Sequence, residues 1–317
     1  MRSAYAAHNR NPETVRRSSS GGIFSLLAAH VLNEGGRVYG AACDENGRIS
    51  YRGISRTAEI PELCGSKYVF VPIAPVMDEI ADLVKDGQTV LAVVSPCQAA
   101  ALRRACGDSG RLILVDFICH GAPPAEFWEK YRAECAQDHG AAVTGVNFRR
   151  KIPGMDWQSY EVELRYADGT VERRRAVDDP YMQTFLRNAS LRKACAVCAA
   201  KGENRASDLT LGDFWGVKKI APEQYHPAGT SLVFVDTPRG EELWRSVQHQ
   251  LVSHPVDAAQ AVQYNPSAHQ PAVLHPQYDA FWRDAQTLTV RELADKYCRP
   301  SASERLKRGL KRMLGRG

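Results

Sequence analysis

The chain of 317 residues is 44% apolar and 24% charged, with 41 Lys and Arg against 36 Asp and Glu. This composition is typical of a globular protein and excludes a fibrous repeat or a disordered chain. The net charge of +5 comes from residues 301–317, which hold six basic side chains and one acidic one. The remainder is neutral and does not indicate nucleic-acid binding.

The sequence contains neither a secretory signal nor a membrane span. Residues 1–22 lack the apolar core of a signal peptide, and no apolar run approaches the roughly 18 residues that cross a bilayer. Nine cysteines, an odd number, argue against a disulfide framework. We therefore expect a cytoplasmic protein whose thiols bind metal, take part in catalysis or pack in the core.

The first predicted elements alternate between helices and strands. Apolar side chains recur at helical spacing from Ile23 to Val31, directly after the sequence SSSGG, and a strand is expected at residues 37–43. Helices and buried strands then continue in turn, at residues 75–85, 89–94, 96–105, 112–118 and 125–137. This alternation predicts an α/β fold.

Strands predominate after residue 143. We expect a hairpin of strands at residues 160–166 and 170–177, preceded by a strand at 146–148. Further strands and helices are expected at residues 209–211, 231–236, 238–250, 279–286 and 289–297. The complete pattern predicts a mixed, mostly parallel sheet with flanking helices and an antiparallel hairpin insertion.

Four of the nine cysteines lie where metal ligands are expected. Cys195 and Cys198 form a CxxC pair, and Cys97 and Cys119 each follow a predicted buried strand, at the edge where open α/β sheets place their sites. If those strands are parallel neighbours, the four thiols converge and suit either a [4Fe-4S] cluster or a structural zinc ion. Basic residues near the CxxC pair would raise the potential of a cluster, namely Arg192, Lys193, Lys201 and Arg205. The other five cysteines are interpreted as packing residues.

Two glycine-containing turns are candidates for ligand binding. The first turn opens the first predicted helix and consists of Ser19, Ser20, Gly21 and Gly22. Its N–H groups and hydroxyls can hold a phosphate or simply cap the helix. A second turn offers a cation beside an aromatic ring, or is ordinary surface, and consists of Gly65, Ser66 and Lys67 followed by Tyr68. The Rossmann and P-loop phosphate motifs are absent.

His120 directly follows Cys119 at the end of a predicted strand. Its ring could donate to a cofactor or move a proton near neutral pH, and it is the one tentative catalytic residue. A hydrogen-bonded structural histidine is the alternative.

Six segments, in this order, resemble one family. They are SSSGGIFSLLA, GSKYVFVPI, SPCQAAALRR, VDFICHGAPP, the FRRK–DW segment, and CAVCAAKGENRASDLTLGDFWGV. Together they resemble the beta subunit of coenzyme F-420 hydrogenase/dehydrogenase, from about residue 18 to residue 297. The resemblance implies an iron–sulfur flavoprotein with FAD and a [4Fe-4S] cluster, which exchanges electrons between a hydride carrier or reducible substrate and a ferredoxin-type partner.

The resemblance also assigns residues and regions. The cluster cysteines would be Cys97, Cys119, Cys195 and Cys198, and the two glycine-containing turns would border the flavin. Residues 1–87 would form the N-terminal family region and residues 88–300 the C-terminal region with the cluster cysteines. A ferredoxin-like module rich in cysteine does not precede residue 18, so we expect a separate ferredoxin-like protein or subunit to exchange electrons with this chain.

Two further hypotheses follow from the residues alone. The chain could be a non-catalytic scaffold in which four thiolates hold a structural zinc ion. Residues 301–317 are expected to form a basic amphipathic tail, which could contact an anionic membrane surface or an acidic partner weakly or could be a frayed, solvated chain end.

Overall fold

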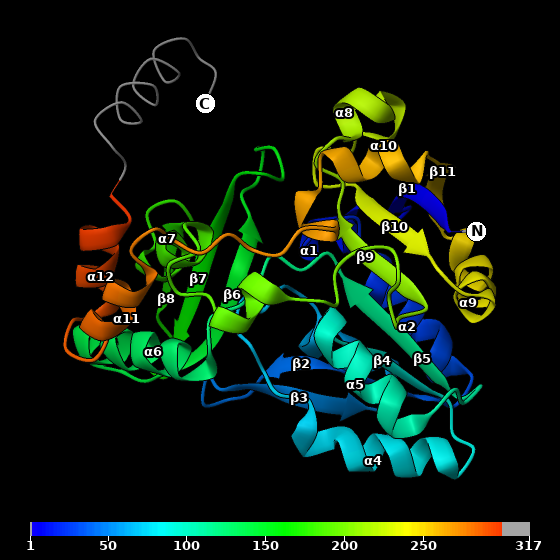
Figure 1. The fold of residues 1–317 in the computed structure, drawn as a ribbon, viewed down its shortest axis with the longest axis horizontal. Helices are drawn as coiled ribbons and strands as arrows, with labels where there is room; N and C mark the ends of the chain where they lie inside the picture. The colour runs from blue at the N-terminus through cyan, green and yellow to red at the C-terminus, as the bar shows by residue number, and fades with distance from the viewer. Residues whose placement is uncertain (1, 300–317) are drawn as a thin grey trace.

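Two β-sheets and their helices make up residues 2–299, which are the residues that the computed structural model describes (Figure 1). The tail predicted for residues 301–317 lies outside them. None of the helices in residues 2–299 is long and apolar enough to cross a membrane.

The larger sheet has eight strands and mixed polarity. Its strands lie in the order β11 (Leu251–Pro255), β1 (Ser3–Asn9), β10 (Ser231–Val235), β9 (Leu209–Asp213), β5 (Leu112–Phe117), β4 (Val90–Val93), β2 (Arg37–Cys43) and β3 (Ile49–Ile54). The four strands from β9 to β2 are mutually parallel, and each of the others is antiparallel to its neighbours. The parallel strands β4 and β5 are short apolar runs because helices cover both of their faces.

Helices pack on both faces of this sheet. One face carries α2 (Ile23–Asn33), α3 (Ile60–Leu63) and α9 (Pro238–Gln248), whose apolar side chains share a core with β2 and β10. The other face carries α4 (Ala74–Lys85) and α5 (Pro96–Cys106) over β4 and β5. Above β1 and β10 lie α8 (Val217–Ile220) and α10 (Ala258–Gln263). The predicted mixed α/β class with flanking helices is confirmed.

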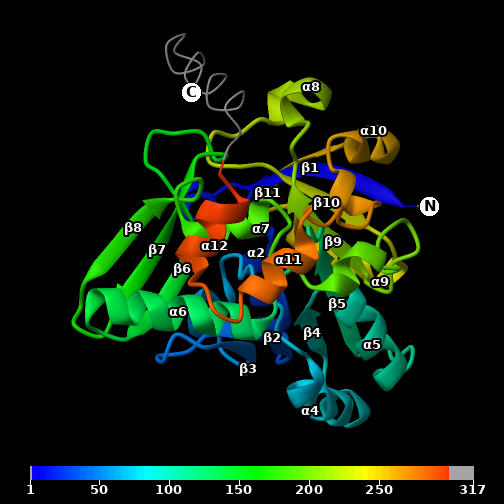
Figure 2. The same ribbon diagram turned by 60° about the vertical axis from the view of Figure 1, so that its left-hand side comes forward.

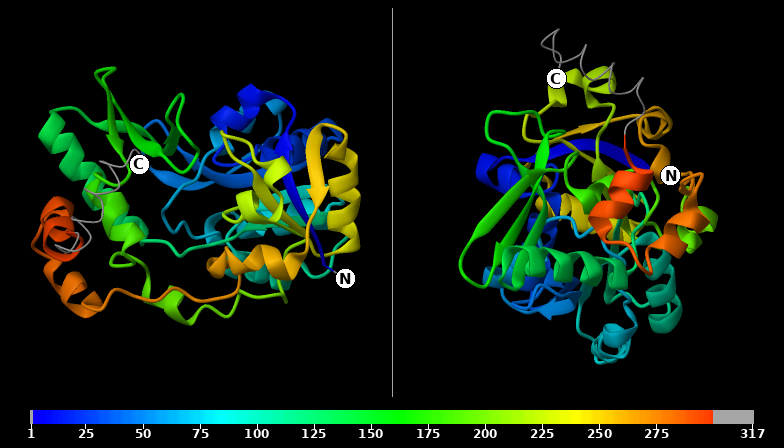
Figure 3. Two further views of the ribbon diagram at one scale, coloured as in Figure 1. Left: turned by 90° about the horizontal axis from the view of Figure 1, so that it is seen from above. Right: turned by 90° about the vertical axis from the view of Figure 1, so that its left-hand side faces the viewer.

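A second, smaller sheet stands beside the first. It consists of β6 (Val143–Lys151), β7 (Tyr160–Tyr166) and β8 (Val171–Arg175), all antiparallel, and so contains the predicted hairpin. Four helices lie beside this sheet (Figure 2), namely α6 (Ala125–His139), α7 (Pro180–Leu186), α11 (Tyr278–Asp284) and α12 (Val290–Tyr297). Their apolar side chains share an aromatic core with the sheet. Seen from above, α11 and α12 lie at the end of the molecule opposite the N-terminus (Figure 3).

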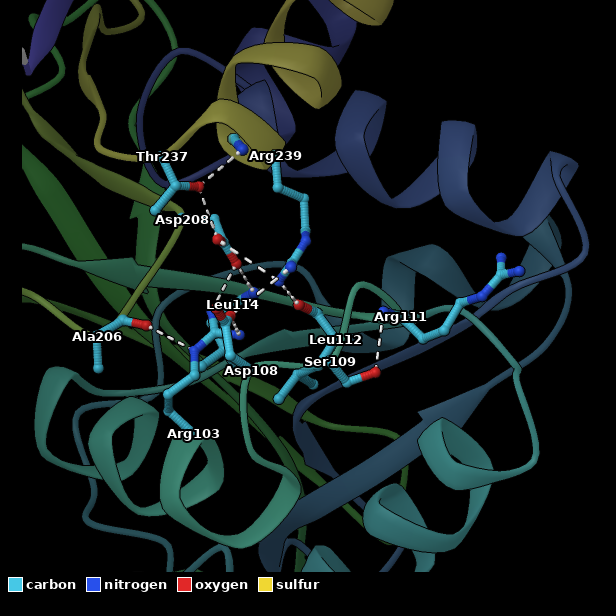
Figure 4. Close-up of polar contacts among 11 residues, drawn as sticks. Arg103, Asp108, Ser109, Arg111, Leu112, Leu114, Ala206, Asp208, Thr237 and Arg239 are labelled. Carbon is cyan, nitrogen blue, oxygen red and sulfur yellow. Dashed lines mark hydrogen bonds and ion pairs between the residues drawn. The ribbon is translucent and has the colours of Figure 1, made fainter.

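A buried carboxylate joins the two faces of the larger sheet (Figure 4). Asp208, immediately before β9, accepts hydrogen bonds from the Leu114 N–H at 2.7 Å and from the Thr237 hydroxyl at 2.7 Å. Arg103 of α5 donates to the same carboxylate at 3.0 Å, and Arg239 of α9 lies 3.9 Å away. Burying a charge requires such compensation, so this network fixes the start of β9 against β5 and both helix layers.

Several elements were not predicted from the sequence. They include the strands β1, β3 and β11 and the helices α1 (Pro12–Arg17), α3, α7, α8 and α10. Strand β1 has the mixed sequence SAYAAHN, which carries no clear alternation of apolar and polar residues. It becomes a strand because it pairs with β10 on one side and β11 on the other. The predicted division at residue 88 falls inside the larger sheet, which takes β1, β2 and β3 from before it.

Candidate functional site

One edge of the larger sheet gathers nearly all the candidate residues. The parallel strands β2, β4, β5 and β9 all end at this edge. Because β10 is antiparallel to β9 and β1 is antiparallel to β10, the start of β10 and the end of β1 lie at the same edge. Open α/β sheets bind ligands outside the carboxyl ends of their parallel strands, so this edge is the candidate site.

One part of the edge, here called the cysteine end, is defined by four cysteines, namely Cys97, Cys119, Cys195 and Cys198. Cys97 begins α5 after β4, and Cys119 follows β5. The Cys119 thiol interacts electrostatically with Cys195 and Cys97. A Cβ added to Gly121 would lie only 3.3 Å from Cys195 Cβ, so the CxxC segment packs directly on the segment after β5. The segments that carry Cys119 and Cys195 therefore lie against each other, and the set of four ligands stays a prediction.

The four described thiols do not form a set of metal ligands. In residues 2–299 no group of three or more Cys, His, Asp or Glu side chains is placed to hold a metal ion. Cys97 Sγ instead lies 3.3 Å from Ser95 Oγ. Burial raises the pKa of Cys119 to about 12, so this thiol is protonated at neutral pH. Metal binding would have to displace that proton, because only the thiolate is a ligand.

Lys201 supplies an uncompensated charge at the cysteine end. Its Nζ is buried and has no hydrogen-bond partner among the described residues. Burial lowers the pKa of Lys201, while the neighbouring thiols Cys119, Cys198 and Cys195 raise it. A buried ammonium without an acceptor is unfavourable. An anionic centre on the thiols would provide the missing acceptor, so the residues present fit a thiolate-bound metal centre.

A buried ion pair anchors the CxxC segment to β5. Arg205 Nη1 lies 2.9 Å from Asp116 Oδ2, and both side chains are at most 1% exposed. Arg205 also donates to the backbone carbonyls of Ala268 and Gly202. Asp116 stands three residues before Cys119 and Arg205 seven residues after Cys198. The pair therefore holds the two cysteine-bearing segments in register, and removing one partner of such a pair costs about 3–5 kcal/mol.

His120 is hydrogen-bonded to a neutral side chain. Its Nε2 lies 2.6 Å from Asn188 Oδ1, and its ring meets Phe185 edge-on at 5.1 Å between ring centroids. Burial lowers the pKa of His120. The neutral ring can donate from Nε2 to Asn188, so the described contacts orient the histidine, and its tentative catalytic role stays a prediction.

The two glycine-containing turns lie side by side at the other part of the edge. The Ser66 N–H donates to Ser19 Oγ at 2.8 Å, and the Ser66 hydroxyl lies 2.9 Å from the same atom. Gly22 has φ +79° and Gly65 has φ +83°, values that favour glycine. Lys67 Nζ donates to the carbonyl of Cys64 at 2.6 Å, and burial lowers the pKa of Lys67 to about 8. Hydrogen bonds between Ser19 and Ser66 thus connect the two turns, and the Lys67 ammonium is hydrogen-bonded to the backbone.

We call the region around the first of these turns the turn end, defined by His8, Ser19–Gly22, His226 and Gly229. Gly21 packs tightly against the backbone of two strands, because an added Cβ would lie 2.5 Å from the Ala7 carbonyl oxygen and 2.9 Å from the Ser231 nitrogen. The Gly21 N–H donates to Ser231 Oγ. Gly21 therefore sits directly on β1 and β10, and there is no room for a side chain at this position.

Sequence reasoning missed a charged and aromatic cluster between the two ends. Arg149 of β6 lies 2.5 Å from Asp213 at the end of β9, and both are largely buried. The Arg149 guanidinium also lies over the rings of Trp157 and Tyr160, at 5.4 and 5.2 Å from their centroids. Lys151, two residues further along β6, donates to backbone carbonyls of the turn end and of α1. The sequence did contain one signal for this cluster, because FRRK places consecutive cations in a strand that has buried positions.

Two family models together match most of the chain. Residues 4–78 match the coenzyme F420 hydrogenase/dehydrogenase beta subunit N-terminal model, and residues 87–258 match the corresponding C-terminal model. None of the curated proteins compared with the chain is similar enough to count as a match.

A solved structure has a similar fold. It is a chain of the F420-reducing [NiFe] hydrogenase complex from Methanosarcina barkeri, studied by xenon derivatization, with a TM-score of 0.53 and 17% identity. The similarity covers 83% of the present chain and 89% of that chain. At this level of identity the match establishes the fold.

Proposed function

Because this chain belongs to the coenzyme F420 hydrogenase/dehydrogenase beta-subunit family and is thus an oxidoreductase subunit, we propose that it is an iron–sulfur flavoprotein. It would pass electrons between a hydride carrier or reducible substrate and a ferredoxin-type partner, through FAD and a [4Fe-4S] cluster. The carrier is an F420-like deazaflavin or another small hydride donor or acceptor.

The observation that carries the proposal is the arrangement of the sheet edge. The thiols of Cys119 and Cys195 interact at one end, with the buried Nζ of Lys201 lacking a partner among the described residues beside them. At the other end, a glycine turn opens an 11-residue helix whose first turn has no side-chain cap. A metal centre needs thiolate ligands, and the phosphate of a flavin nucleotide needs free N–H groups such as those at the start of a helix.

Each cofactor would supply a different step. A flavin exchanges a hydride as two electrons, whereas an iron–sulfur cluster passes one electron at a time. The four thiolates would hold the cluster, and Arg205 with Asp116 would fix the distance between their segments. The turns at Ser19–Gly22 and Gly65–Lys67 would border the flavin, and the two cofactors would share one sheet edge.

A partner is required because electrons must leave or enter singly. We propose a separate ferredoxin-like protein or subunit, in keeping with the similar fold found in a multi-subunit hydrogenase. A small-molecule carrier or substrate would meet the flavin.

The test is the cofactor content of anaerobically purified protein. We expect iron and acid-labile sulfide at about four each per chain for one [4Fe-4S] cluster, one FAD, and a yellow-brown colour. Colourless protein with one zinc ion per chain would refute the proposal and support the scaffold in which four cysteines hold a structural zinc ion.

A further inference from the structure

Several basic side chains gather at the turn end. His8 at the end of β1 and His226 before β10 lie with their ring centroids 4.7 Å apart. Burial lowers the pKa of His226, and the charges of His8, Lys151 and Arg16 lower it further. These three charged neighbours among the described residues are all basic side chains.

Neighbouring carboxylates are already engaged. Asp213, which interacts with Lys151, is held by Arg149 at 2.5 Å. Arg16 is exposed and pairs with Glu13 on the same helix at 3.0 Å. Burial lowers the pKa of Lys151 to about 7, as expected for an ammonium with only carbonyl acceptors. The positive charge here is thus not matched by the described residues.

The ring nitrogens have defined roles. His8 Nδ1 lies 3.1 Å from the Asn9 carbonyl oxygen, which can only accept, so that nitrogen carries a proton. His226 Nδ1 accepts from the Ala228 N–H at 3.1 Å, so a neutral His226 carries its proton on Nε2. His226 therefore keeps one N–H donor beside the turn even when it is uncharged.

Close backbone packing places these groups against the Ser19–Gly22 turn. Gly229 has φ +120°, and a Cβ added to it would lie 3.2 Å from the Ser20 carbonyl carbon. Lys151 Nζ donates to the Ser20 carbonyl at 2.9 Å. Both His226 and Lys151 are consequently tied to the same turn, and His8 and His226 are only partly buried, so a ligand can reach them.

We infer that His8, His226 and Lys151 bind a phosphate group beside the Ser19–Gly22 turn. Partly desolvated cations and N–H donors form strong charge-assisted hydrogen bonds with phosphate oxygens. The inference rests on the proposed function, from which it follows that the ligand is the diphosphate of FAD. Contacts with this group would then distinguish FAD from flavins without phosphate.

The test compares FAD with riboflavin on the full-length protein stripped of flavin. We expect the wild type to bind FAD at least about tenfold more tightly than riboflavin, as flavin fluorescence reports. His226→Gln should weaken FAD binding about fivefold or more and leave riboflavin binding unchanged, with inorganic phosphate competing less well than in the wild type. His8→Gln should act in the same direction.

His254→Gln is the matched control, because His254 is an exposed histidine on the neighbouring strand β11. It should change neither affinity. If the wild type binds FAD but His226→Gln loses FAD and riboflavin binding equally, or loses neither, the inference is overturned and the proposed function is not. Competition by phosphate without a preference for FAD over riboflavin would overturn the assignment to the flavin. Absence of FAD binding by the wild type would refute the proposed function as well.

Discussion

The cysteine end and the turn end occupy the same sheet edge but are built from different kinds of groups. At the cysteine end the reactive groups are side chains, and segments far apart in the sequence are held together by the Arg205–Asp116 pair. At the turn end the backbone itself packs on neighbouring segments, because Gly21 lies against β1 and β10 and Gly229 lies against Ser20. The first end depends on which side chains are present, and the second depends on which are absent.

The largest expected effect is at the cysteine end. Cys119→Ser should reduce bound iron to background, because a serine hydroxyl does not ionise near neutral pH and cannot replace the thiolate ligand. FAD content should stay at the wild-type level, because the turn end is built independently. Iron and flavin analysis of the same anaerobic sample measures both.

Cys106→Ser is the control for this change, since Cys106 is a half-buried cysteine at the end of α5 and not a candidate ligand. It should keep its iron. Parallel loss of FAD and iron in Cys119→Ser would show that the two ends do not act separately.

The next effect is at the turn end. Gly21→Ala places a Cβ within 2.9 Å of backbone atoms of Ala7 and Ser231, which cannot move without disturbing two strands. We expect a loss of about 1–3 kcal/mol in the free energy of unfolding and a marked loss of FAD, with iron retained. Urea unfolding and cofactor analysis provide the measurements.

Gly110→Ala tests whether the loss is due to packing. An added Cβ there meets nothing within 4 Å, and its φ is not in the left-handed region. This variant should be as stable as the wild type. A Gly21→Ala protein of wild-type stability would contradict the close packing of the turn.

The smallest effect concerns the electrostatics of the cysteine end. Lys201→Gln removes a buried positive charge beside Cys119, Cys195 and Cys198, and positive charge favours the more negative, reduced cluster. The midpoint potential in an EPR-monitored titration should become more negative, by about 59 mV for each ~1.4 kcal/mol of lost stabilisation.

Lys201→Arg should retain the wild-type potential because it keeps the charge. Lys193→Gln, which removes an exposed cation from the same segment, should change the potential little because water screens it. An unchanged potential in Lys201→Gln would mean that the ammonium does not interact with the centre.

Much of the layered architecture could be predicted from the sequence. The apolar runs that became β4 and β5 are short and continuous, as parallel strands covered on both faces must be, and the Ala167-Asp168-Gly169 turn predicted the β7–β8 hairpin. Strands β1 and β11 could not be predicted, because neither has a regular apolar pattern and each is stabilised by backbone pairing with a partner more than 200 residues away.

The candidate site was predictable only in part. The CxxC spacing makes Cys195 and Cys198 candidate ligands, and the position directly after a buried strand does the same for Cys97 and Cys119. For Arg149 and Lys151 the consecutive cations of FRRK were the only signal, and the contacts of Arg149, Lys151 and His226 could not be predicted, because their partners come from other elements.

By itself the sequence determined which chemistry is available: four cysteines in motif positions, two glycine turns and an alternation of helices and strands. Residue type and local spacing suffice for this, since they set propensity, periodicity and ligand identity. Only the tertiary structure decided that Ser19 meets Ser66, that Arg205 pairs with Asp116, and that His8 lies beside His226. These contacts arise because strand order places distant segments at one edge, and strand order depends on the pairing of the whole sheet.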